Sequence, residues 1–326
     1  MKKVFLLLLL IAVQSISAQM YIKSEPFTHT YSIVARDSVT GDMGVAVQSH
    51  WFSVGSIATF GEAGVGVVAT QSLVNQSYGP KGLALMKQGL SPQAALDMLL
   101  SSDEGEMYRQ VAFLNSNGDV ATHTGDLCIA EAGHRQGKNF SVQANMMLKN
   151  TVWDAMANAF EKTQGSLSKR MLAALKAAQY QKGDIRGKQS AAILIVKAEA
   201  TGNSWEDTIM DLCVEDHKNP VVELERLVKV HKAYDFMNKG DLAMEHGDSK
   251  KAEELYLQAQ KLFPYNLEMQ YWYAVNLLNN KQFSKAYPIL KSIFRRDRNW
   301  KTLTPRLVKS KLLNIDEAEL NKIMRF

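Results

Sequence analysis

The chain has 326 residues, of which 46% are hydrophobic and 22% charged, a composition typical of globular proteins that excludes an intrinsically disordered chain. Its formal net charge of +5 is modest for this length, and its Lys and Arg residues are spread along the chain, which argues against a nucleic-acid-binding protein. The length suffices for one large domain with a small one, or for two medium domains.

The N-terminus carries the pattern of a secretory signal peptide over residues 1–18. Two lysines precede an apolar run over residues 4–13, and the small residues of "SISA" end at Ala18. This order predicts cleavage before Gln19 and an exported protein, periplasmic or extracellular. An uncleaved anchor is the alternative, although the run is short for a membrane span. No later stretch is apolar enough to cross a bilayer, so we expect no membrane association after cleavage.

After a lead-in over residues 19–27, residues 28–232 have the pattern of a mixed domain. Apolar strands come in pairs, and so do the helical stretches between them, which differs from the alternating rhythm of a doubly wound sheet. We therefore predict an α+β fold, a four-layer αββα sandwich with two antiparallel sheets inside. The expected strands cover 31–37, 43–51, 64–72, 108–115, 120–126, 139–147, 189–198 and 208–216, and the expected helices cover 79–102, 152–181 and 220–237.

The character of the sequence changes over residues 233–326, where a tetratricopeptide-like pattern predicts a small all-α domain. In the first repeat, small residues fall where two antiparallel helices need close approach, among them Gly240, Ala252 and Ala259. A second repeat starts near Leu267. A generic pair of helical hairpins is the alternative, with nearly the same shape. Two repeats bury little surface by themselves, so the neighbouring helices are expected to cap them.

Side chains that could carry chemistry are scattered at the ends of the expected strands, with no phosphate loop, zinc-protease helix or Gly-x-Ser-x-Gly elbow. Each has a plain alternative as an ion pair, a turn cap or a loop residue. A metal centre around Asp126 and His134 lacks ligand spacing, so we expect no metal and no cofactor. The candidates are Thr30, Arg36, Asp37, Gln71, Asn75, His134 and Asn145, together with Asp184, Arg186 and Ser190 of "GDIRGKQS".

The two cysteines, Cys128 and Cys213, both lie in strand-like contexts, "GDLCIAE" and "MDLCVED". In an exported protein they could form a disulfide. We favour two buried thiols, because Cys also serves as a small hydrophobic residue.

Residues 28–235 closely resemble the domain-of-unknown-function 1028 family. The resemblance rests on motifs that follow one another in order, including "TYSIVARDSVTGDMGVAV", "YRQVAFLNSNGDVATHTGD", "AGHRQGKNFSVQANMM" and "DIRGKQSAAILIV". That family is placed among the N-terminal nucleophile (Ntn) hydrolase-like folds, which are αββα sandwiches, and its activity is not established. The resemblance therefore implies a fold more firmly than a reaction.

An Ntn fold implies that the side chain of the first residue is the nucleophile and that its free α-amine, which titrates near pH 8, is the base. The position that matches the family's nucleophile is Thr30. Signal cleavage alone would leave eleven residues, Gln19–His29, ahead of it. The chemistry therefore requires a second cleavage between His29 and Thr30. In a hydrolase of this type, we expect Arg36 and Asp37 to orient the hairpin and the amine.

The sequence thus supports two functions of different classes. The first is an exported amide hydrolase that acts on a small amide or peptide, such as one from the cell wall, with polar contacts from Gln71, Asn75, His134 or Asn145. The second is a non-catalytic binding module that keeps the sandwich as a ligand pocket. In both, the tetratricopeptide-like segment would bind a protein partner on its concave face. Both functions are compatible with a homo-oligomer.

Overall fold

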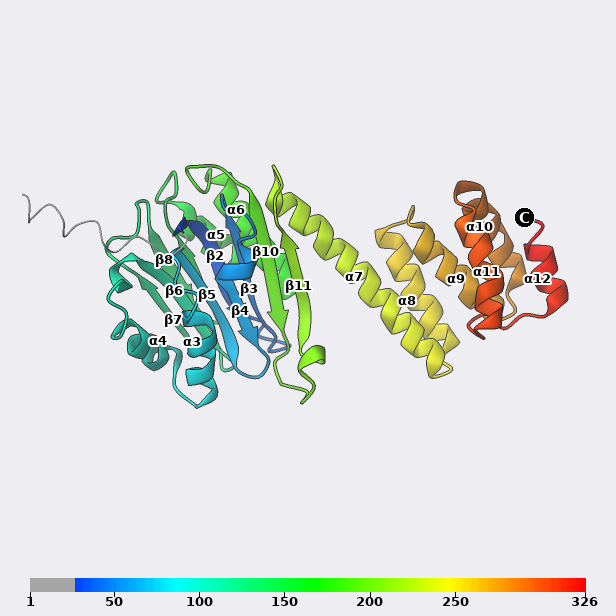
Figure 1. Ribbon diagram of the computed structural model, residues 1–326, viewed down its shortest axis with the longest axis horizontal. Coiled ribbons are helices and arrows are strands. Elements are labelled where there is room, and N and C mark those ends of the chain that lie inside the picture. The colour runs from blue at the N-terminus through cyan, green and yellow to red at the C-terminus, as the bar shows by residue number, and fades with distance from the viewer. Residues whose placement is uncertain (1–26) are drawn as a thin grey trace, which may run out of the picture. The chain divides into compact units, whose positions relative to one another are not determined.

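The computed structural model describes residues 27–326, so the predicted signal peptide and residues 19–26 of the lead-in lie outside the described residues. The chain forms two compact units, the first ending at Glu225 and the second spanning Arg226–Phe326. Figure 1 shows that the first unit contains two antiparallel sheets with helices and that the second is helical. No helix within residues 27–326 is both long and apolar enough to cross a membrane.

The larger sheet has six strands in the order β11-β10-β3-β2-β9-β8, and every neighbouring pair is antiparallel. Its two central strands, β2 and β3, form a hairpin whose turn contains Gly41 at φ +80°, a conformation that favours glycine. In chain order the strands are β2 (Thr30–Arg36), β3 (Met43–Ser49), β8 (Gly133–Gly137), β9 (Phe140–Ala144), β10 (Ser190–Val196) and β11 (Thr208–Val214).

The second sheet has five strands, ordered β1-β5-β6-β7, with β4 also paired to β5. The two short strands β1 and β4 pair with different parts of β5, at Ser72–Leu73 and at Gly66–Ala69. The strands are β1 (Phe27–Thr28), β4 (Thr59–Glu62), β5 (Gly66–Leu73), β6 (Arg109–Asn115) and β7 (Val120–Thr124).

The two sheets pack face to face through alternate residues of their central strands. Val34 of β2 and Val45 of β3 belong to one buried cluster with Val67 and Ala69 of β5 and Ala112 of β6. Because side chains alternate along a strand, the other face of β2 carries its own apolar residues, which meet helices. Fully burying a valine contributes about 1.5 to 3 kcal/mol, so this cluster is a main source of stability.

Helices cover the outward faces of the two sheets. On the six-stranded sheet, α5 (Val152–Lys162) and α6 (Leu167–Tyr180) contact the central strands and β8 and β9. On the five-stranded sheet lie α3 (Tyr78–Lys87) and α4 (Pro92–Leu100). A Cβ on Gly82 would lie 2.4 Å from the Phe113 ring, so a residue without a side chain lets α3 approach β6 closely. Short turns of helix occur at α2 (Gly55–Ala58), Glu106–Tyr108 and Ser204–Glu206.

Two local expectations need correction. The segment around His134, which lies outside the expected strands, is the edge strand β8; the pattern hides it because its sequence, GHRQG, contains no apolar residue. Cys128 is buried as expected, but Cys213 is exposed, because β11 is an edge strand whose outer residues face solvent. Both thiols are free, so the two cysteines do not form a disulfide.

The second unit is a series of helices joined by short turns. The helix α7 runs without a break from Pro220 to Glu245, across the boundary at residue 233 that the sequence suggests, because no proline or glycine interrupts residues 221–239. It is followed by α8 (Ser249–Leu262), α9 (Leu267–Asn279), α10 (Phe283–Arg296), α11 (Asn299–Lys309) and α12 (Glu317–Ile323).

Small residues let these helices approach one another. A Cβ on Gly240 would lie 2.7 Å from the ring of Tyr256, so α7 and α8 meet closely there. Ala252, Ala259 and Ala274 are buried in the shared core of this unit. The side chains of Asp248, Asn266 and Asp316 accept hydrogen bonds from backbone amides at the starts of α8, α9 and α12, which fixes where those helices begin.

Gln48 offers a test of how polar groups stabilise the first unit. It is fully buried on the face of β3 beneath the helices, and its side-chain amide has no hydrogen-bond partner in the described part of the chain. Leaving a buried amide unpaired costs about 1 to 3 kcal/mol. Gln48→Met should therefore raise the melting temperature, by about 2 to 4 °C per kcal/mol in a unit of this size. Near-UV circular dichroism during heating measures it.

The matched control is Gln110→Met, at another fully buried glutamine whose side chain makes several hydrogen bonds. That change should lower the melting temperature. A Gln48→Met protein that melts at a lower temperature than the unaltered protein would contradict the argument.

Candidate functional site

Thr30 is the first residue of β2, and it is fully buried. Its hydroxyl donates a hydrogen bond to the carbonyl oxygen of Thr28 at 2.9 Å. Its own carbonyl oxygen accepts from the backbone amide of Asn145 at 3.1 Å and from the side chain of Gln71 at 3.3 Å. Both sheets therefore contact Thr30, since Gln71 belongs to β5 and Asn145 follows β9.

Two side chains donate hydrogen bonds to the carbonyl oxygen of the peptide bond before Thr30. The oxygen of His29 accepts from the hydroxyl of Ser49 at 2.6 Å and from the guanidinium Nη2 of Arg186 at 2.9 Å. The carboxylate of Asp184, itself buried, holds that guanidinium through contacts at 2.7 and 3.1 Å. Two donors, one of them charged, are thus aimed at the oxygen that would become negative if this carbonyl were attacked.

The imidazole of His29 begins a chain of side-chain hydrogen bonds. Its Nδ1 lies 2.7 Å from Oδ1 of Asn145, whose Nδ2 donates to Oε1 of Gln110 at 2.9 Å. Nε2 of Gln110 donates to Thr124, and the Thr124 hydroxyl lies 2.9 Å from Nδ1 of His134. Because the amide of Asn145 offers an oxygen, Nδ1 of His29 is the donor in the first contact. The chain therefore sets the tautomer of His29.

The ionisation of His29 follows from its surroundings. Burial lowers the pKa of its imidazole, and the nearby charge of Arg186 lowers it further, while the hydrogen bond to Asn145 acts in the opposite direction. The pKa of His134 is also lowered, by burial and by His123. Both ends of the hydrogen-bonded chain thus favour neutral imidazoles.

Gln71 joins this chain to the rest of the buried polar groups between the sheets. Its Nε2 donates to Gln110 at 2.6 Å, and its Oε1 accepts from the hydroxyl of Ser32 at 2.6 Å. Ser32 in turn accepts from Gln143 at 2.5 Å. We call this set of residues the inter-sheet network; it consists of His29, Ser32, Gln71, Gln110, Thr124, His134, Gln143 and Asn145.

The network brings together three of the substrate-contact candidates, Gln71, His134 and Asn145, and links them to Thr30. Sequence reasoning missed Ser49, Gln110 and Gln143 as site residues. One signal could have found the two glutamines: each is a large polar residue directly beside buried apolar residues of its strand. Asp184 and Arg186 stood out in the sequence without a role, because their loop reaches the start of β2 only in the folded chain.

Arg36 and Asp37 are not part of this site. They lie at the opposite end of β2, about 20 Å from Thr30 at roughly 3.3 Å per residue. The carboxylate of Asp37 accepts from the backbone amides of Val39 and Thr40, at 2.8 and 3.1 Å, and so stabilises the hairpin turn. This placement corrects the expectation that the two residues orient the amine of Thr30.

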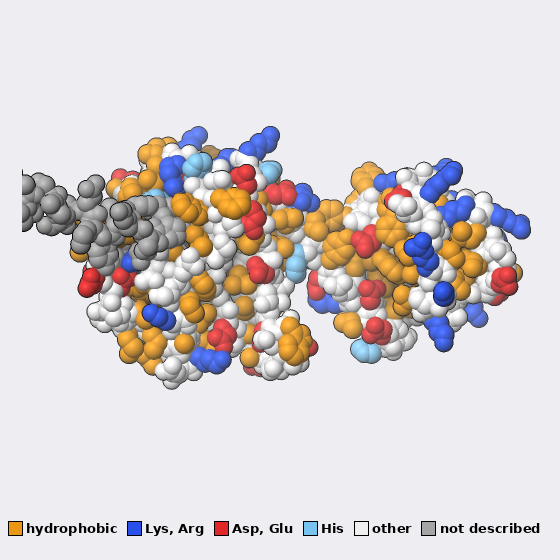
Figure 2. Space-filling model, in the orientation of Figure 1, with side chains coloured by type: hydrophobic (Ala, Val, Ile, Leu, Met, Phe, Trp, Pro, Cys, Tyr) orange, Lys and Arg blue, Asp and Glu red, His pale blue; other side chains and the backbone are white. Residues whose placement is uncertain are grey.

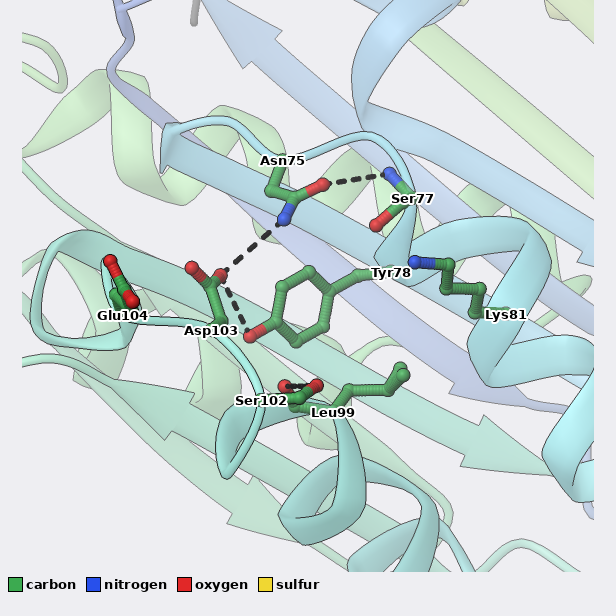
Figure 3. Close-up of a pocket in the computed structure, with 8 residues that line it drawn as sticks. All are labelled: Asn75, Ser77, Tyr78, Lys81, Leu99, Ser102, Asp103 and Glu104. Carbon is green, nitrogen blue, oxygen red and sulfur yellow. Dashed lines mark hydrogen bonds between the residues drawn. The ribbon is translucent and has the colours of Figure 1, made fainter. Parts of the chain in front are cut away.

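Asn75 is also separate from the network, and it lines a cavity of about 280 Å³ that no network residue lines. Figure 3 shows its amide pointing to Asp103, with Nδ2 at 3.4 Å from the carboxylate, while Oδ1 accepts from the amide of Ser77. Tyr78 also donates to Asp103, as Figure 3 shows, and Arg109 binds both carboxylate oxygens, at 2.8 and 3.1 Å. The carboxylate is thus already surrounded by donors from the protein, which favours a structural role.

Within residues 27–326, no group of three or more His, Cys, Asp and Glu side chains is arranged to hold a metal ion.

Asp103 gives the stability of the first unit a dependence on pH. Burial opposes its charge, but hydrogen bonds from Arg109, Gly105 and Tyr78 outweigh burial and lower the pKa of the carboxyl to about 2. Because the unfolded value is about 3.9, the resulting stabilisation is complete above that pH and is lost as the pH falls towards 2. Asp103→Asn should therefore lower the melting temperature at pH 7, and the difference from the unaltered protein should shrink towards pH 2.

Thermal unfolding between pH 2 and pH 7 measures this difference. Glu104→Gln is the matched control, since Glu104 is the exposed neighbour of Asp103, and its effect should be small at every pH. A difference for Asp103→Asn that is constant over this range would count against the explanation.

Comparisons with known proteins give one family. Among solved structures, a DUF1028 protein from Silicibacter pomeroyi is 29% identical, with 62% of this chain and 88% of that chain covered and a TM-score of 0.56. Anbu (ancestral beta-subunit) from Yersinia bercovieri is 12% identical over 62% of this chain and 96% of its own, with a TM-score of 0.31. No curated protein matches the chain. The family model for the family of unknown function DUF1028 matches residues 30–224, more than half of the chain, so this protein belongs to that family.

Proposed function

We propose that the protein is an exported amide hydrolase of the Ntn type, with Thr30 as its nucleophile once the bond between His29 and Thr30 has been cut. The observation that carries the proposal is the carbonyl oxygen of His29, which accepts hydrogen bonds from Ser49 and from Arg186. The same two donors would stabilise the negative oxygen formed when a hydroxyl attacks a carbonyl at this position.

The fold supports this proposal. Two antiparallel sheets that pack face to face, with helix pairs outside, are what an Ntn-type αββα sandwich requires. Thr30 opens a central strand of one sheet, and its carbonyl contacts a residue of the other. The start of β2 is thus held rigidly, as a nucleophile on a scaffold should be.

The cut would proceed without a cofactor. The hydroxyl oxygen of Thr30 attacks the carbonyl carbon of His29, the new C–O bond forms, the C–N bond breaks, and the hydroxyl proton passes to the departing nitrogen. Water then hydrolyses the ester, which leaves a carboxylate on His29 and a free hydroxyl and amine on Thr30. During turnover the amine takes the hydroxyl proton and returns it to the leaving amine of an external amide.

The main alternative is a non-catalytic binding module on the same scaffold. It accounts for the surroundings of Thr30, which is buried and whose hydroxyl donates a hydrogen bond to Thr28. In that function the inter-sheet network would serve stability alone. The two functions differ in whether Thr30 ever becomes the first residue.

For the second unit we propose a tetratricopeptide-like segment that binds an acidic protein partner. The small residues at helix crossings, Gly240, Ala252, Ala259 and Ala274, support such repeats. Residues 226–326 carry 19 Lys and Arg against 11 Asp and Glu, and residues 281–311 carry ten against the single Asp297. Figure 2 shows Lys and Arg side chains gathered over this part of the helical unit.

The test of the hydrolase is N-terminal sequencing of the purified protein together with an amidase assay. The mature chain should begin at Thr30, and Thr30→Ala should leave the chain uncut and without amidase activity. Thr30→Ser keeps a hydroxyl and is the matched control, which should still be cut. A protein that stays uncut at His29–Thr30 and hydrolyses no amide would support the binding module instead.

The test of the helical segment is binding of a fluorescein-labelled polyglutamate peptide, measured by anisotropy. Arg306→Glu with Lys309→Glu, two exposed residues of α11, should weaken binding at least tenfold at low salt. Lys250→Glu with Lys261→Glu changes the net charge equally on α8, outside residues 281–311, and should have a smaller effect. Equal losses in the two double variants would show attraction by net charge alone and would refute a local site.

A further inference from the structure

We infer that the segment Phe27–His29 occupies the site of the substrate, so that the substrate is an extended peptide cleaved after a residue with a neutral hydrogen-bond donor in its side chain. This inference rests on the proposed function. It adds the class of substrate and the residues that select it, which an amide hydrolase mechanism alone does not give.

The backbone of this segment is bound as a peptide substrate would be. Phe27 and Thr28 form the strand β1, which pairs antiparallel with Leu73 and Ser72 at the edge of β5. After a cut between His29 and Thr30, release of the segment would leave this edge of β5 without its partner. An open strand edge is a template that another extended chain can join through main-chain hydrogen bonds.

The next group along the segment is the carbonyl of His29, whose oxygen accepts hydrogen bonds from Ser49 and Arg186. A substrate that pairs with β5 as β1 does would place the carbonyl of its third residue on the same two donors. The bond then cleaved would be the one after that residue. Strand pairing and the carbonyl contacts therefore fix one register for the peptide.

The side chain of His29 shows what the third residue must offer. It is buried, and its Nδ1 donates to Oδ1 of Asn145, which Gln110 holds in place. The guanidinium of Arg186 lies close enough to disfavour a second positive charge, and the nearby carboxylate of Asp184 offsets this effect only in part. The position thus accepts a neutral donor such as histidine and discriminates against lysine and arginine.

The side chain of Thr28 adds a preference at the second residue. It is fully buried, and its hydroxyl has no hydrogen-bond partner among the described residues. Valine has the same shape without the hydroxyl, so a peptide with valine here should bind at least as well as one with threonine.

The experiment uses the processed protein and fluorogenic peptide amides. We expect kcat/KM for acetyl-Phe-Thr-His-aminocoumarin to exceed that for the Phe-Thr-Lys analogue at least tenfold, and Phe-Val-His to be cleaved no more slowly. The free acid acetyl-Phe-Thr-His should inhibit competitively, because its carboxylate would bind Ser49 and Arg186 in place of the His29 carbonyl group. A scrambled acetyl-His-Thr-Phe acid should not.

A charge change at Asn145 tests the selecting residue. In Asn145→Asp a carboxylate replaces the amide, so the preference should move towards the lysine peptide and the His/Lys ratio of kcat/KM should fall at least tenfold. Asn75→Asp is the matched control, since it makes the same change in the separate cavity, and it should leave the ratio unaltered. Should Asn145→Asp fail to fold, inhibition of the unaltered protein by the free acid still decides.

The outcomes separate this inference from the proposed function. If the chain is cut and hydrolyses small amides, but shows neither the histidine preference nor inhibition by the free acid, the inference is wrong and the hydrolase stands. If the chain is never cut and no amide is hydrolysed, both fall. Preference together with inhibition supports both.

Discussion

The architecture of the first unit depends on the inter-sheet network of hydrogen-bonded amides. Gln71 and Gln110 belong to one sheet and Gln143 to the other, and all three are fully buried. An unpaired amide at such a depth destabilises the fold, so each of these side chains must find partners in the opposite sheet or along its own. That requirement fixes how the two sheets are aligned, in a way that the apolar contacts between valines and alanines do not.

The interface between the two sheets is polar at the end where the network lies and apolar at the other end. Val34 and Val45, further along the hairpin, contact apolar residues of β5 and β6, as in an ordinary core. Towards Thr30 the facing side chains become Ser32, Gln71 and Gln110. A fold that needed only stability would gain by filling this end with apolar residues, since satisfied buried amides contribute little net free energy. The polar end therefore points to a requirement other than stability.

The sequence was sufficient for most of the elements, because strand and helix periods are local. The pairing of the strands and of the helical stretches and the change of character towards a helical C-terminal region can all be read from the pattern. The edge strand β8 was missed because its five residues, GHRQG, include no apolar side chain that would mark an inward face. The helix expected over residues 220–237 extends to Glu245 as α7, since a repeat pattern suggests where a unit begins but does not interrupt a helix.

The site was harder to predict, because it is assembled by contacts between distant parts of the chain. Thr30, Gln71, His134 and Asn145 could be selected as polar residues near strand ends, but Arg36 and Asp37 were selected by the same reasoning and lie at the wrong end of β2. The contacts of Ser49 and Arg186 with His29 span 20 and 157 residues of sequence. No spacing rule connects such positions, so only the fold reveals that they share one oxygen atom.

The carbonyl oxygen of His29 matters both for the folded structure and for the proposed reaction. While the chain is uncut, the contacts of Ser49 and Arg186 with His29 help to fix the segment that precedes β2. A hydrogen bond that involves a charged group contributes about 1.5 to 3 kcal/mol, and removal of its partner leaves a buried donor unsatisfied. If the segment were released after the proposed cut, the same donors could be satisfied again by a ligand that places a carbonyl oxygen between them. In the proposed hydrolase, the groups that hold this segment in place are therefore the ones that would bind a substrate.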